Sequence, residues 1–167
     1  KDCQDAKIVP IVEPELVYDG DYPIEKNIEI TGKILDKLFE EIKKKGVNLR
    51  ACVLKVNMVL AGKKQEHQST PEEVGQATAR VLRDHVPHEL AGVVFLSGGQ
   101  SVQQATDNLQ AVTNCGPFPW PVTFSYARAL QDPALFAWKG DNSNADAARE
   151  AFRERLIANA NALIKRR

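Results

Sequence analysis

Four short apolar segments of the sequence each end in residues that could do chemistry. The first ends in Glu13 and Glu15, the second in Lys55, and the third and fourth in the runs 97–100 (Ser-Gly-Gly-Gln) and 125–128 (Ser-Tyr-Ala-Arg). In parallel α/β folds, functional residues gather where strands end and loops begin. If the four segments are parallel strands, we expect carboxylates, an amine and anion-binding groups to meet at one edge of the sheet.

Lys55 is the most unusual of these residues, because it follows Val53 and Leu54 in an apolar segment and lysine is rarely buried without a partner. Burial disfavours the charged form of an amine, and a neutral amine can attack a carbonyl carbon to form a Schiff base. The alternative is a structural lysine, paired with Glu13 or Glu15 or solvated at the strand end. Position alone leaves both interpretations open.

Glu13 and Glu15 are separated by one residue, so on a strand both side chains point to the same face. Two close carboxylates can differ in proton affinity, which suits general acid–base chemistry beside an amine. The alternative is that they are ordinary loop or helix-cap carboxylates.

The run Ser97-Gly98-Gly99 lies between a predicted strand and a predicted helix, and Arg128 occupies the corresponding position after the fourth strand. Glycines allow close backbone approach, and free amides together with an arginine can bind a phosphate. The alternative is a tight turn. His85 and His88 have the spacing of a metal pair, but no cysteine or carboxylate cluster is near them in the sequence, and we expect no metal site.

The composition is that of one globular domain. The chain has 167 residues, 22 Lys+Arg against 22 Asp+Glu, and 43% hydrophobic residues. Zero net charge argues against a broad nucleic-acid surface, and no apolar run approaches the length of a membrane span. The three cysteines, an odd number with no Cys-x-x-Cys pair, indicate a reducing compartment, and we expect a cytoplasmic protein. The first residue is Lys1, and we expect the sequence to be one piece of a longer protein.

Strands alternate with helices along the sequence. Apolar residues recur every three or four positions from Ile24 to Ile42, and Gly46 suits the end of that helix. Two more helices carry capping-box signals, one beginning with Thr70 and Glu73 and the other with Ser101 and Gln104. The predicted strands cover residues 8–12, 51–55, 92–96 and 121–125, and two final helices cover about 129–138 and 144–164.

The element order is therefore βαβαβαβαα, with a repeat of roughly 40 residues. This order predicts a parallel α/β sheet with right-handed crossovers, either part of a TIM barrel or a doubly wound sheet. No Gly-x-Gly-x-x-Gly follows the first strand, which weakens a dinucleotide-binding interpretation. Four strands suffice for half of an eight-stranded barrel and not for a whole one.

The strand-end segments together resemble the class I fructose-bisphosphate aldolase family, in order and spacing across nearly the whole chain. The matching stretches are residues 9–15, 54–59, 95–101 and 124–131. The resemblance implies the C-terminal half of a (β/α)8 TIM barrel, strands five to eight plus a C-terminal helix. Residues 1–167 would then form a single α/β domain.

The resemblance also implies a reaction, the reversible cleavage of fructose 1,6-bisphosphate to dihydroxyacetone phosphate and glyceraldehyde 3-phosphate. Lys55 resembles the Schiff-base lysine, Glu13 the carboxylate that assists dehydration and proton transfer, and Glu15 its charged neighbour. No metal or other cofactor is implied, because the iminium withdraws the electrons. The residues that resemble the phosphate site are Ser97, Gly98, Ser125, Ala127 and Arg128.

Several features depart from the family pattern. Val56 stands where the family usually has proline, and Ala127 where it often has glycine. The family's C-terminal tyrosine tail and the strands one to four, which supply the second phosphate site and further acid–base groups, have no counterpart in these residues. The alternative function is an inactive half-barrel that binds sugar phosphate or self-associates without turnover. The expected partners are a sugar phosphate and either a second copy or the missing half, with no nucleic acid and no membrane.

Overall fold

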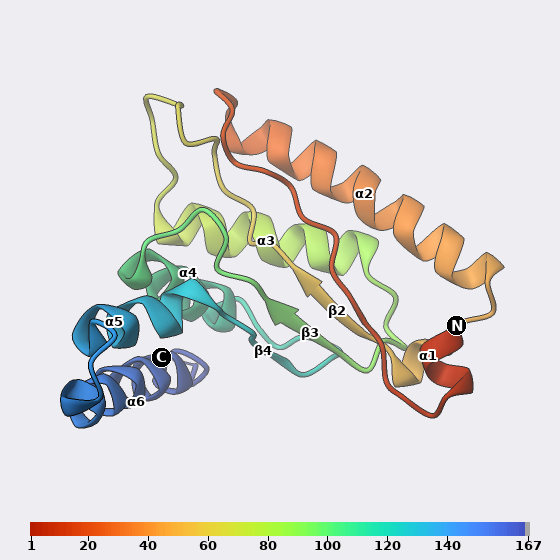
Figure 1. Cartoon of the computed structure of the whole chain (residues 1–167). Coiled ribbons are helices and arrows are strands. Elements are labelled where there is room, and N and C mark those ends of the chain that lie inside the picture. Colours follow the sequence, from red (N-terminus) through yellow and green to blue (C-terminus); the bar gives the residue numbers. More distant parts are fainter. Residues whose placement is uncertain (166–167) are drawn as a thin grey trace.

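The computed structural model describes residues 1–165 and shows a parallel sheet flanked by helices (Figure 1). The strands are β1 (Ile11–Val12), β2 (Val53–Val56), β3 (Gly92–Phe95) and β4 (Val122–Phe124). The helices are α1 (Asp2–Asp5), α2 (Ile24–Lys44), α3 (Pro71–His85), α4 (Val102–Asn114), α5 (Arg128–Trp138) and α6 (Ala145–Asn161), with short 3-10 turns at Leu49–Ala51 and Asn142–Asn144.

The four strands form one sheet in the order β1-β2-β3-β4, and every neighbouring pair is parallel. Val12 lies opposite Leu54, and Lys55 lies opposite Val94 on the next strand. Sequential strands are therefore spatial neighbours. Because all four strands are parallel, their carboxyl ends lie at the same end of the sheet. The predicted parallel α/β class with four strands is confirmed.

The hydrophobic core lies between the sheet and helices α2, α3 and α4, which run along one side of it (Figure 1). Leu54, Val56, Val93 and Phe95 are almost completely buried in this core. Residues of opposite parity, such as Lys55 and Val94, are only partly buried, because side chains alternate across a strand. The second face of the sheet is therefore open, and Lys55 stands on it.

Both predicted capping boxes are present. The Thr70 and Ser101 side chains accept hydrogen bonds from the backbone amides of Glu73 and Gln104. The Glu73 and Gln104 side chains in turn accept hydrogen bonds from the backbone amides of Thr70 and Ser101. These caps fix where α3 and α4 begin. They therefore also fix the lengths of the loops that follow β2 and β3.

The first strand is shorter than predicted, Ile11–Val12 and not 8–12. Pro10 has no amide hydrogen, so it can only accept a bond, and its carbonyl does so from the Val53 amide at 3.0 Å. Ile8 and Val9 lie outside the strand and are more than half exposed.

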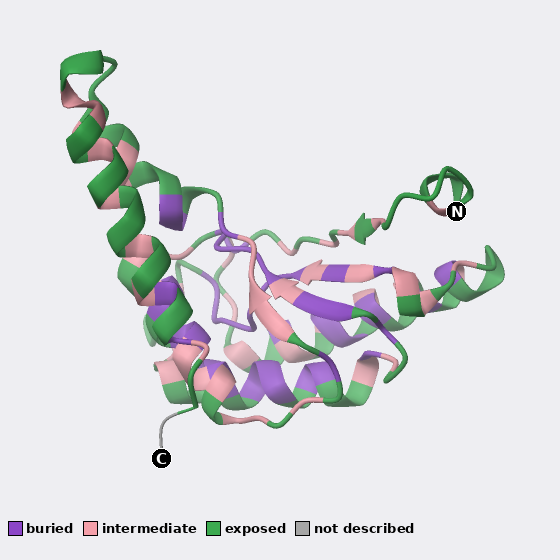
Figure 2. Cartoon of the chain, turned by 90° about the horizontal axis from the view of Figure 1, so that it is seen from below, coloured by how far each residue is buried: buried purple, intermediate pink, exposed green. Residues whose placement is uncertain are grey.

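Helices α5 and α6 pack on each other and form an arm that projects away from the sheet (Figure 2). Its surface carries exposed apolar side chains, among them Phe136, Leu135 and Ile157. Within residues 1–165, no helix is both long and apolar enough to span a bilayer.

Candidate active site

All eight residues singled out from the sequence line one pocket of about 180 Å³ at the carboxyl ends of the strands. Four loops contribute, because each strand of the parallel sheet ends at the same edge. The lining residues are Glu13, Glu15, Lys55, Leu96, Ser97, Gly98, Ser125, Ala127 and Arg128. Their predicted proximity is therefore observed, whereas their chemical roles stay predictions.

Lys55 and Glu13 form an ion pair, with 2.9 Å between Nζ and Oε1. The strand register explains the contact. Val12 of β1 pairs with Leu54 of β2, so the residues that follow them, Glu13 and Lys55, lie side by side on the open face of the sheet. The Lys55 side chain is 20% exposed and that of Glu13 44% exposed. The lysine side chain is thus largely covered, as the Schiff-base interpretation requires, and it is also paired with Glu13, as the structural-lysine alternative describes. Both interpretations therefore stay open, and Glu13 lies within reach of the lysine's proton.

Glu15 lies against the glycine loop that follows β3. A Cβ placed on Gly98 would stand 2.7 Å from Glu15 Oε1 and 2.9 Å from Leu96 Cδ1. Any larger residue at this position would therefore push the carboxylate out of its present place. The glycine is needed for this close approach, and the contact links the carboxylate side of the pocket to the loop side.

The opposite wall of the pocket can hold an anion. Helix α5 begins at Arg128 and has Ala127 at its N-cap, and both residues line the pocket where β4 ends. Ser97 Oγ accepts a hydrogen bond from the Ala129 amide at 3.4 Å, joining the two loops. A helix N-terminus with an arginine beside it suits a phosphate group.

Two buried polar residues of the loops after β1 and β2 were not assigned a role from the sequence. Asn57 Oδ1 accepts from the Leu16 amide at 2.9 Å, and its Nδ2 donates to the Leu16 carbonyl at 3.3 Å. The Tyr18 hydroxyl donates to the Met58 carbonyl, and burial raises the pKa of this hydroxyl, so it stays protonated. The signal that could have found Asn57 is a lone polar residue within the apolar run 56–61.

The Tyr18 ring also supports the glycine loop. Gly99 has a φ of +79°, and a Cβ there would stand 2.5 Å from Tyr18 Cδ2. The ring therefore fills the space that a side chain would need. In this way the loop after β1 supports the loop after β3.

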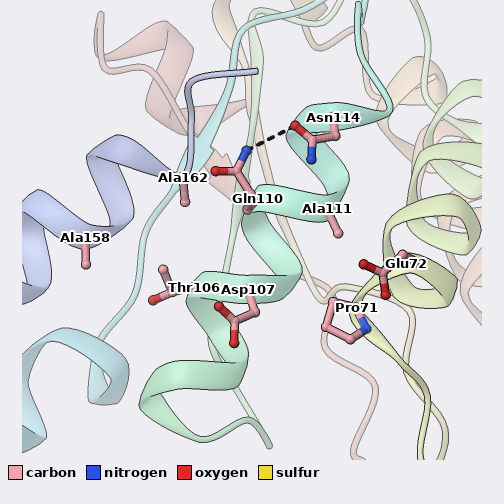
Figure 3. Close-up of a pocket in the computed structure, with 9 residues that line it drawn as sticks. All are labelled: Pro71, Glu72, Thr106, Asp107, Gln110, Ala111, Asn114, Ala158 and Ala162. Carbon is pink, nitrogen blue, oxygen red and sulfur yellow. Dashed lines mark hydrogen bonds between the residues drawn. The ribbon is translucent and has the colours of Figure 1, made fainter. Parts of the chain in front are cut away.

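A second hollow of about 290 Å³ lies between α3, α4 and α6 and contains none of the predicted residues (Figure 3). It carries two carboxylates, Glu72 and Asp107, and a hydrogen bond of 3.1 Å from Gln110 to Asn114. Across residues 1–165, no group of three or more His, Cys, Asp or Glu side chains could hold a metal ion. His85, one of the two histidines weighed as a metal pair, instead contacts Asp36 at 2.7 Å.

Comparison with known proteins points to one family. A family model described as glycolytic fructose-bisphosphate aldolase class-I matches residues 1–166. The fructose-bisphosphate aldolase of Plasmodium falciparum (isolate K1 / Thailand) is 46% identical over 158 residues, which is 95% of this chain and 44% of the relative. Human fructose-bisphosphate aldolase C is also 46% identical over 158 residues, 94% of this chain and 43% of the relative.

A solved structure gives the same result for the fold. It is a ternary complex of Plasmodium falciparum fructose-bisphosphate aldolase with TRAP and a small molecule inhibitor, and it superposes with a TM-score of 0.94 at 45% identity. The match covers 96% of this chain and 46% of that one. The chain therefore spans less than half the length of the relatives it matches.

Proposed function

The chain belongs to the class I fructose-bisphosphate aldolase family, and on that premise we propose that its pocket performs the Schiff-base chemistry of aldol cleavage. The substrate is fructose 1,6-bisphosphate, and the products are dihydroxyacetone phosphate and glyceraldehyde 3-phosphate. The observation that carries the proposal is the Lys55–Glu13 ion pair, 2.9 Å apart, in one pocket with the Arg128 end of α5.

The first half of the reaction forms the Schiff base. Lys55 loses a proton, for which Glu13 is the nearest acceptor in the pocket, and its Nζ attacks the C2 carbonyl of the substrate. The carbinolamine that results loses its hydroxyl as water once that hydroxyl is protonated, and Glu13 is placed to return the proton. The product of these steps is an iminium bond between Lys55 and C2.

The second half cleaves the carbon–carbon bond. A base removes the proton of the C4 hydroxyl, the C3–C4 bond breaks, and its electron pair moves into the iminium to give an enamine. The aldehyde product leaves, C3 of the enamine takes up a proton, and water hydrolyses the imine to release dihydroxyacetone phosphate and Lys55. The iminium accepts the electrons, so this mechanism uses neither a metal nor another cofactor.

The phosphate of the dihydroxyacetone side binds between the loops after β3 and β4 in this proposal. Ser97 and Gly98 offer one wall, and Ser125, Ala127 and Arg128 offer the other. The remaining parts of the family's apparatus, including the second phosphate site, belong to strands one to four of the barrel. The proposed setting is the cytoplasm, which the odd number of cysteines supports.

Borohydride trapping with dihydroxyacetone phosphate tests this function. Sodium borohydride reduces the imine to a stable amine, and peptide mass spectrometry then locates it. We expect one adduct, on Lys55, that is absent from the variant Lys55→Met and present in Lys63→Met, a control that changes a more exposed lysine. A folded chain that forms no adduct on Lys55 would contradict the proposal.

A second candidate function is a half-barrel that associates through its sheet edges without turnover. The observation that favours it is the pair of edge strands, β1 and β4, together with the exposed side chains of Ile8, Val9 and Ile11 beside β1. An open strand edge invites pairing with another chain. In this case phosphate binds equally well to the unsubstituted chain and to Lys55→Met, and no adduct forms in either.

A further inference from the structure

We propose that Asn57 is a positioning residue that holds the Glu13–Glu15 segment against Lys55. The inference deepens the proposed function, on which it rests, because it names the group that keeps the proton acceptor beside the nucleophile. Asn57 lies two residues after Lys55 on the same strand end, and it is 4% exposed.

The side-chain amide of Asn57 continues the strand pairing beyond the end of the ladder. The last register pair of β1 and β2 is Val12 with Leu54. Leu16 lies four residues after Val12, and Asn57 lies three residues after Leu54. The Asn57 side-chain amide makes two hydrogen bonds with the Leu16 backbone, one accepted from its N–H and one donated to its C=O. Because an asparagine amide offers the same two groups as a peptide bond, it replaces a strand neighbour here.

This contact bounds the segment that carries both carboxylates. Glu13 and Glu15 lie between Val12, held by β2, and Leu16, held by Asn57. The segment is thus fixed at both ends by β2 and the residue Asn57 just after it, the stretch that also carries Lys55. Since Asn57 is buried, its two bonds exchange little with water, and loss of the amide leaves the Leu16 backbone groups without these partners.

The phosphate side of the pocket is held by different contacts. Ser97 Oγ accepts a hydrogen bond from the Ala129 amide, and Ala127 and Arg128 belong to the start of α5, so neither feature involves Asn57. Loss of the Asn57 amide should therefore displace the carboxylates and leave the α5 part of the phosphate wall, with Arg128, in place. This separation gives a result that a general loss of stability would not give.

The test compares Asn57→Leu, which has nearly the same size and no amide, with the control Thr78→Val. Thr78 Oγ1 accepts a hydrogen bond from the Val59 amide at 2.9 Å, is equally buried, and supports the same chain segment from the α3 side. We expect the rate of borohydride trapping on Lys55 to fall about 10- to 100-fold in Asn57→Leu, because a displacement of about 1 Å can cost that much. We expect the affinity for inorganic phosphate, measured by calorimetry, to stay unchanged, and Thr78→Val to retain both.

Equal trapping rates in Asn57→Leu and the unsubstituted chain would overturn the inference, as would equal losses in Asn57→Leu and Thr78→Val. Amide hydrogen exchange supplies a readout that does not need the reaction. We expect Asn57→Leu to lose protection at residues 13–17 and not on α3 or α4, and unchanged protection would also overturn the inference. If the unsubstituted chain forms no adduct, the proposed function fails, and the exchange result still decides whether Asn57 holds this segment.

Discussion

The Glu13 carboxylate has two tasks in the proposed reaction, to accept the proton of Lys55 and to return it during dehydration. In Glu13→Gln the amide oxygen can still accept a hydrogen bond from Nζ, but the side chain can no longer carry a proton. We expect the trapping rate to fall by about 100- to 10,000-fold, the usual contribution of a positioned acid–base group. Single-turnover borohydride trapping measures this rate, and the exposed loop variant Glu66→Gln serves as the matched control. A rate equal to that of the control would show that Glu13 transfers no proton.

Arg128 provides the charge of the phosphate wall at the first residue of α5. We expect Arg128→Ala to weaken the binding of inorganic phosphate by about 10- to 100-fold, because a hydrogen bond to a charged group contributes about 1.5–3 kcal/mol. Calorimetry at fixed ionic strength measures the affinity. Arg149→Ala, which removes an exposed arginine on α6, should leave it unchanged. Similar affinities in the two variants would place the phosphate elsewhere.

The side chains of the pocket could be predicted from the sequence because polar residues at strand ends stand out against apolar strands. Lys55 and Arg128 are visible in this way, and parallel topology brings them together. Asn57 and Tyr18 could not be assigned a role, because their partners are backbone groups of Leu16 and Met58, whose positions depend on how the loops fold. The ion pair of Lys55 with Glu13 was predicted only as one form of the structural-lysine alternative, beside a pair with Glu15 or a solvated lysine, and the register of β1 and β2 produces it.

The elements could be predicted wherever a local signal fixes them. The caps at Thr70 and Ser101 mark two helix starts, and the apolar stripe of α2 marks a third helix. The predicted strands 51–55, 92–96 and 121–125 differ by one or two residues at their ends from β2, β3 and β4. Of the strand predicted at 8–12, only Ile11–Val12 forms a strand, because pairing depends on the neighbouring strand β2 and Pro10 has no amide hydrogen to donate. Helix α1 has no apolar period, and it was not predicted.

The loop after β3 depends on a glycine whose backbone other residues adopt with difficulty. Gly99 has a φ of +79° and its missing side chain leaves room for the buried Tyr18 ring, whereas Gly46 at the end of α2 has a φ of +63° and open space around it. We expect Gly99→Ala to lower the free energy of unfolding by about 2–4 kcal/mol, from backbone strain plus overpacking. Gly46→Ala should lower it by only about 1–2 kcal/mol, from strain alone. Urea denaturation measures both, and equal losses would show that the Tyr18 contact contributes nothing.

At the scale of the whole molecule, the sheet has helices on one face and an open second face that carries the site (Figures 1 and 2). The strands at its two edges are β1 and β4. Closing such a sheet into a barrel removes its edges, and four further strands would also enclose Lys55 and Glu13 from the open side. The relatives it matches are more than twice as long as this chain, which supports the proposal that a second half or a second copy completes the barrel.

Association through the β1 edge can be tested with a charge placed on that strand. Ile11 is 58% exposed, so Ile11→Lys should fold, but an edge lysine opposes pairing with another strand. We expect the chain to self-associate at micromolar concentrations in sedimentation equilibrium, and Ile11→Lys to raise the dissociation constant by more than about tenfold, or 1.4 kcal/mol. Val17→Lys is the matched control, because Val17 is 66% exposed and lies outside the strand. If both variants weaken association equally, the β1 edge is not the contact. If the unsubstituted chain remains monomeric at every concentration, a second copy does not complete the barrel, and any completion must come from a different chain.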